Sequence, residues 1–80
     1  MNKFSKIHEG RGKYLIRVGD ASSKDFPLYQ FRVCSWGSQW FMYEVDQQDI
    51  SKPLSCGFAS ATKAIRYGVT NYNVLQGKSS

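Results

Sequence analysis

The sequence predicts an α+β fold in which a three- to four-stranded antiparallel sheet packs against one C-terminal α-helix. Two aromatic-rich strands are expected at residues 28–35 and 39–45, because aromatic and β-branched residues favour extended backbone. Gly37 lies between them and permits a tight hairpin. After residue 60, small and apolar residues recur at helical spacing, which indicates a helix with one face on the sheet.

The segment before the hairpin contributes less regular structure. Residues 1–12 are polar and contain Gly10 and Gly12, so we expect a loose basic N-terminal arm. Residues 14–18 form a short β-prone run. Residues 21–27 should form a loop, since Pro27 lacks the N–H that a central strand donates. The 80 residues are expected to fold as a single small domain, and its thin core needs the 15% of aromatic residues.

The hairpin has two predicted faces. We expect the chain to turn through residues 36–38, so that one face lies under the helix and the other points outward. The covered face is predicted to hold Phe31, Val33, Phe41, Tyr43 and Val45. The outward face is predicted to hold Gln30, Arg32, Trp36, Trp40 and Met42.

The C-terminal helix follows a short third strand expected at residues 54–57. Ser60 is a good N-cap, because its hydroxyl can accept a hydrogen bond from the first turn. The stripe facing the sheet consists of Ala61, Ala64, Ile65, Gly68, Tyr72 and Leu75. The opposite face carries Lys63 and Arg66, and residues 76–80 are expected to form a flexible tail.

The net charge of +5 is unevenly distributed along the chain. Residues 1–17 carry +4, residues 18–60 carry −2, and residues 61–80 carry +3. Basic flanks of this kind fit attraction to nucleic acid or to an acidic protein surface, although net charge also serves solubility. Glu44, Asp46 and Asp49 make the end of the second hairpin strand acidic, and they would repel a phosphate backbone running past it.

No residue pattern predicts catalysis, a cofactor or a metal site. His8 is the only histidine, and the adjacent Glu9 does not make a catalytic pair with it. Cys34 and Cys56 lack zinc-type spacing and are expected to be free thiols, with a bridge possible only if their strands are neighbours. Residues 1–17 contain no continuous apolar stretch, so we expect no secretory signal. No run in the sequence approaches the ~18–20 apolar residues that a membrane span requires, and with no catalytic pattern we expect a cytoplasmic protein that is not an enzyme.

One group of residues spans about half of the chain and resembles a known DNA-binding family. The residues are Tyr29, Arg32, Trp36-Gly37, Trp40, Glu44-Val45, Gly57-Phe58, Ser60-Ala61, Ala64 and Arg66. Together they resemble the DNA-binding domain of the ethylene-response-factor type, which also occurs in phage proteins. That domain packs three antiparallel strands on one helix and reads DNA through arginines and tryptophans on its exposed sheet face. The resemblance implies DNA contacts by Arg32 and Trp36, and also by Trp40 and Glu44.

We therefore expect a small non-enzymatic nucleic-acid-binding accessory protein, with DNA favoured over RNA as its partner. The predicted contact residues are Arg32, Trp36, Trp40, Gln30, Lys63, Arg66, Arg11 and Lys13. Arginine and tryptophan are also enriched at protein-binding hot spots. The alternative is therefore a phage or mobile-element inhibitor that docks on a host enzyme or defence complex.

Overall fold

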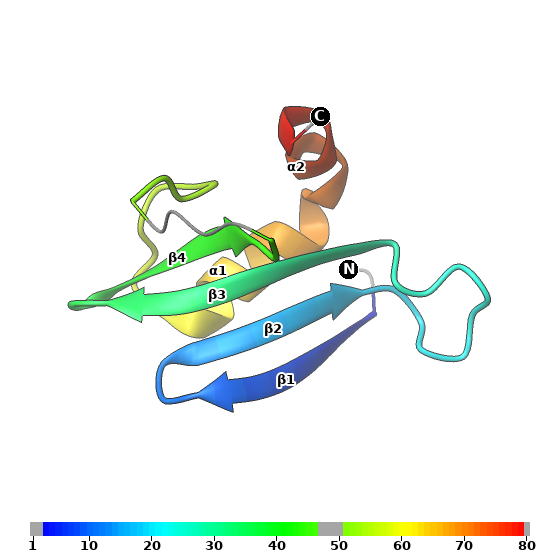
Figure 1. Cartoon of the computed structure of the whole chain (residues 1–80), viewed down its shortest axis with the longest axis horizontal. Helices are drawn as coiled ribbons and strands as arrows, with labels where there is room; N and C mark the ends of the chain where they lie inside the picture. Colours follow the sequence, from blue (N-terminus) through cyan, green and yellow to red (C-terminus); the bar gives the residue numbers. More distant parts are fainter. Residues whose placement is uncertain (1–2, 47–50, 80) are drawn as a thin grey trace.

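The computed structural model describes residues 3–46 and 51–79, with side chains described as far as residue 75. Four strands form one antiparallel sheet in the order β1-β2-β3-β4 (Figure 1). Their bounds are β1 Phe4–Gly10, β2 Lys13–Val18, β3 Tyr29–Trp36 and β4 Gln39–Glu44. Helices α1 (Ala61–Thr70) and α2 (Tyr72–Ser79) follow, and α1 packs against β3 and β4. The predicted α+β fold class is confirmed.

Strand β1 replaces the loose arm that we expected at residues 1–12. It pairs with β2 from Phe4 opposite Val18 to His8 opposite Tyr14. The tight turn between the two strands is possible because Gly12 has φ +67°, in the left-handed region that glycine adopts at low cost. The polar composition of β1 concealed it, since an edge strand tolerates charged side chains well. Residues 1 and 2 lie outside the described part of the chain.

The core lies between α1 and one face of the sheet. Across the sheet, Ile16 is paired with Phe31, and Val33 is paired with Met42. Fully buried side chains from three strands and the helix meet there: Ile16, Val18, Phe31, Val33, Met42, Ala64 and Val69. Helix α1 begins as expected, because the Ser60 hydroxyl accepts a hydrogen bond from the Lys63 N–H at 3.3 Å.

The side-chain alternation of β4 is opposite to the one we predicted. Trp36 pairs with Gln39, so the β3–β4 hairpin turns through two residues and not through the three of 36–38. A shift of one residue moves every side chain of a strand to the other face. Met42 therefore lies on the helix-facing side, while Phe41 and Tyr43 lie on the opposite side.

The segment after β4 covers the sheet edge without adding the third strand expected at residues 54–57. Trp40 and Phe58 exchange two backbone hydrogen bonds, of 2.8 and 2.9 Å, as an isolated bridge. The Leu54 N–H donates to the Met42 carbonyl at 2.7 Å. The expected single helix is divided at Asn71, whose side chain donates to the Tyr67 carbonyl at 2.9 Å.

The backbone of α2 includes residues 76–79, which we expected to be a flexible tail, and residue 80 lies outside the described part. Among the described residues, neither helix has the length and apolar character needed to cross a membrane.

Candidate functional site: the open face of the sheet

The sheet has an open face, on the side opposite α1. Side chains alternate along each strand, so the residues between the core positions point away from the helix. In cross-strand rows, the open face holds Arg17 and Gln30, then Ile7, Leu15, Arg32 and Tyr43, then Lys13, Cys34 and Phe41, with Trp36 beyond them. Four of the eight predicted contact residues lie on this face, namely Gln30, Arg32, Trp36 and Lys13.

Arg32 lies at the centre of the open face, and its guanidinium already has partners. Its Nε donates to Oε1 of Glu9 at 2.8 Å, and its Nη1 donates to the Val45 carbonyl at 3.0 Å. The hydrogen bond from Arg32 lowers the pKa of Glu9, and the same bond raises the pKa of Arg32. Both groups therefore stay charged and neutralise each other. Arg32 is held within the sheet by strand β1, which the sequence analysis did not anticipate.

Gln30 also has a partner on its own sheet face. Its Oε1 accepts a hydrogen bond from Nε of Arg17 at 3.3 Å, between strands β3 and β2. Because the two side chains are both half-buried, this contact fixes the end of the open face far from the β3–β4 turn. The Arg17 guanidinium keeps its other N–H donors in addition to the one used here.

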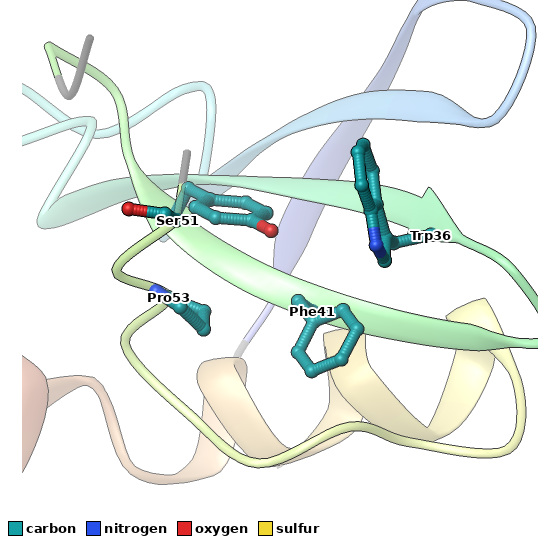
Figure 2. A pocket seen from close by; sticks show the side chains of 5 residues that line it. Trp36, Phe41, Ser51 and Pro53 are labelled. Carbon is teal, nitrogen blue, oxygen red and sulfur yellow. The ribbon is translucent and has the colours of Figure 1, made fainter. Parts of the chain in front are cut away.

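An aromatic groove lies at the other end of the open face. It has a volume of about 380 Å³ and is lined by Trp36, Phe41, Tyr43, Ser51 and Pro53. Trp36 extends from the end of β3 and Phe41 from β4, while Ser51 and Pro53 belong to the segment that follows β4 (Figure 2). Trp36 is 67% exposed and Tyr43 only 6%. The exposed Trp36 and the aromatic lining beside it make this end of the open face a candidate binding surface.

Basic residues lie at the same end as this groove. The Ser35 N–H donates to the Gly12 carbonyl at 2.8 Å, which holds the β1–β2 turn beside the β3–β4 turn. Arg11 and Lys13 are exposed on that first turn. Lys13 is opposite Cys34, which is in turn opposite Phe41, so the lysine is two strands away from the groove. We name Arg11, Lys13, Trp36 and Phe41 the basic-aromatic end.

The acidic residues gather at the far end of the sheet. Glu44 is the last residue of β4, five positions beyond the Gln39 that pairs with Trp36, which corresponds to roughly 17 Å along a strand. Asp46 lies next to it, and Asp20 follows β2 at the same end. A backbone hydrogen bond from Ser22 lowers the pKa of Asp20. The predicted repulsion of phosphate by Glu44 and Asp46 therefore does not act at the basic-aromatic end. Asp49 lies outside the described residues.

Three predicted contact residues lie on the helix side. The outward position predicted for Trp40 is wrong, because its ring packs on the core side, 5.8 Å from the Tyr14 ring. Lys63 and Arg66 are exposed on α1, and Arg66 lines a shallow groove of about 270 Å³ together with Lys6. They cannot act on the same ligand surface as Trp36, since the sheet separates them.

Phe41 is the site residue that the sequence analysis missed. It was assigned to the covered core because the hairpin was expected to turn through three residues. The signal that would have placed it is the Gly37-Ser38 pair, since Gly37 has φ +66° and suits a two-residue turn.

No protein-family model matches the sequence, and no curated protein or solved structure matches it either. Within residues 3–46 and 51–79, no group of three or more His, Cys, Asp or Glu side chains is placed to hold a metal ion. What the chain binds must therefore be inferred from the shape and charge of its own surface.

Proposed function

We propose that this chain is a small cytoplasmic, non-enzymatic accessory protein that binds nucleic acid at the basic-aromatic end of its open face. The observation that carries the proposal is the position of the exposed Trp36 beside Arg11 and Lys13. Nucleic acid offers the two features that this surface matches, because its phosphates attract cations and its bases stack on aromatic rings.

The charge of the open face supports a polyanionic partner. Arg32 and Glu9 neutralise each other at 2.8 Å, which leaves Arg11 and Lys13 as the described cations available to phosphates at the basic-aromatic end. With about two phosphate contacts, log K should fall against log salt with a slope near −1.4 for a single strand or −1.8 for a duplex. Binding should therefore weaken roughly 7- to 12-fold between 50 and 200 mM salt.

The proposal differs from what the resemblance implied in the role of Arg32. In the resemblance, Arg32 contacts DNA, whereas here its hydrogen bonds to Glu9 and Val45 occupy it. Trp36 keeps its proposed role because it is exposed, and Trp40 is left out because it packs against Tyr14. Phe41 takes its place.

The test is a salt titration of binding to fluorescent DNA, with charge variants on and off the surface. Lys13→Gln should weaken binding and reduce the steepness of the salt slope by about 0.7–0.9. Lys24→Gln is the matched control, because Lys24 is exposed in the loop after β2, at the other end of the sheet, and should leave both quantities unchanged. Glu9→Gln should strengthen binding, because it removes an anion and releases Arg32 to contact phosphate.

Absence of binding to duplex and single strand at low salt would refute the proposal. The aromatic groove around Trp36 and Phe41 would then favour the alternative partner, a host protein captured by an inhibitor of phage or mobile-element origin. Capture of one such protein that is lost in Trp36→Ala would support that alternative.

A further inference from the structure

We propose that the ligand is a single strand, and that one of its bases stacks in the groove against Trp36 and Phe41. This inference rests on the proposed function and names the form of nucleic acid that the same site takes. It follows from three features of the open face: the width of the sheet, the hydrogen bonds that hold Arg32, and the size and aromatic lining of the groove.

The sheet is too wide to enter a duplex groove in the manner that a three-stranded domain would. Four strands span three spacings of about 4.8 Å, or roughly 14 Å between the outer backbones, before side chains are added. The major groove of B-DNA is only about 12 Å wide. Strand β1, which the resemblance did not include, therefore argues against insertion of the whole face into duplex DNA.

The side chain best suited to read base edges is also held by two hydrogen bonds within the sheet. Arginine recognises guanine through two parallel donors aimed at one base edge. In this chain Arg32 directs its Nε to Glu9 and its Nη1 to the Val45 carbonyl, at 2.8 and 3.0 Å. Strand β1 thus both widens the face and, through Glu9, occupies the arginine at its centre. The open face lacks a central reader of duplex sequence among its described residues.

The groove instead is lined by aromatic side chains, on which a base inside a duplex cannot stack. In a duplex each base is covered on both sides by its neighbours, whereas in a single strand a base can turn its face to an aromatic side chain. The groove volume of about 380 Å³ lies in the range of sites that hold small ring-containing ligands, about 300–1,000 Å³. Trp36, which is 67% exposed, and Phe41 supply the rings.

The cations are placed to hold the strand that carries such a base. Lys13 lies two strands from Phe41, or about 10 Å across the sheet, and Arg11 lies on the neighbouring turn. A strand that runs across the ends of β2, β3 and β4 would therefore place a base at the groove and phosphates at the lysine. The acidic residues Glu44 and Asp46 lie at the far end and do not oppose this path.

The experiment compares three probes by fluorescence anisotropy, of which the two single strands have equal phosphate number and the duplex has about twice as many. The first is an oligothymidylate of about twelve nucleotides, within the ~4–16 nucleotides that single-strand-binding folds cover. The second is the same strand annealed to its complement, and the third is an abasic strand of the same length. Binding of the oligothymidylate should be at least about fivefold tighter than binding of the abasic strand, since one stacked base contributes a factor of about 5 to 150. The duplex should bind more weakly than the oligothymidylate.

Variants assign the effect to the groove. Trp36→Ala and Phe41→Ala should each weaken oligothymidylate binding by about 5- to 150-fold while leaving abasic binding unchanged, and Trp36→Phe should recover part of the loss. Tyr67→Ala is the matched control, because this exposed aromatic residue lies on α1, on the other side of the sheet. Circular dichroism of each variant verifies that it is folded. Comparison of the oligothymidylate with an oligouridylate of the same length distinguishes DNA from RNA as the nucleic acid that is bound.

Two results would overturn the inference and leave the proposed function standing. One is equal binding of the abasic strand and the oligothymidylate, which would mean phosphate contacts alone. The other is tighter binding of the duplex, with no effect of Trp36→Ala. If none of the three probes binds at low salt, the proposed function fails as well.

Discussion

Replacement of Gly68 by alanine should destabilise the protein, although the same change usually stabilises a helix. Gly68 is buried in α1, directly over the ring of Phe31. A Cβ built at Gly68 would lie 2.8 Å from both Cε atoms of that ring and closer still to Cζ. Phe31 is fully buried in the centre of β3, so its ring has no free space to move into.

Two opposing effects determine how much Gly68→Ala changes the free energy of unfolding. Alanine is favoured over glycine in a helix interior by about 1 kcal/mol. Overpacking of a core costs about 1–3 kcal/mol, and three ring atoms at once place this site at the upper end. The expected net loss is therefore about 2 kcal/mol. For a domain of this size, that loss lowers the melting temperature by roughly 8–16 °C.

Thermal unfolding followed by circular dichroism measures the loss. Gly10→Ala is the matched control, because a Cβ at Gly10 would meet nothing within 4 Å and should leave the melting temperature nearly unchanged. Phe31→Leu should rescue part of the effect, since the shorter side chain makes room, with a coupling of about 0.5–3 kcal/mol between the two positions. A Gly68→Ala variant that melts higher than the wild type would refute the packing of α1 on β3 described here.

Two further predictions concern Glu9 and the cysteines. Because its partner Arg32 lowers the pKa of Glu9, the pair stabilises the fold above pH ~4.3 and the stabilisation is lost as pH falls through the lowered pKa. The free energy of unfolding, measured with denaturant, should therefore fall between pH 6 and 3 by up to about 1 kcal/mol less in Glu9→Gln than in the wild type. An equal fall in the two proteins would contradict this. Cys34 and Cys56 are free thiols, and burial raises the pKa of Cys34. An alkylating reagent should therefore label the exposed Cys56 first and both after denaturation, whereas no labelling without prior reduction would indicate a disulfide.

The strongest local patterns in the sequence predicted most of the fold. Strands β3 and β4 were recognised from their aromatic and β-branched residues, and the start of α1 from Ser60. Strand β1 was missed because its existence depends on pairing with β2, and not on its own composition. Pairing between segments is a tertiary effect that local propensity does not contain.

The candidate site was harder to predict, because it depends on which side chains of β4 point to the open face. A hairpin turn shorter by one residue moved Trp40 into the core and brought Phe41 to the open face. The contact between Glu9 and Arg32 spans two strand spacings and joins residues far apart in the sequence. The exposure of Trp36 was predicted correctly, since a residue at a hairpin turn has few neighbours to cover it.

The polarity of the open face is a consequence of the order of its turns. In an antiparallel meander, every second connection returns to the same end of the sheet. The β1–β2 and β3–β4 turns therefore lie at the same end of the sheet (Figure 1). The hydrogen bond between Ser35 and Gly12 holds them together and brings Arg11 and Lys13 to the end that carries Trp36. The β2–β3 loop and the end of β4 meet at the opposite end, with Asp20 and Glu44. Arg11 and Lys13 thus lie at one end of the sheet, and Asp20 and Glu44 lie at the other end together with Lys3 and Arg17. The nucleic acid that we propose as the partner would meet cations for its phosphates and aromatic rings for its bases at the same end of the sheet.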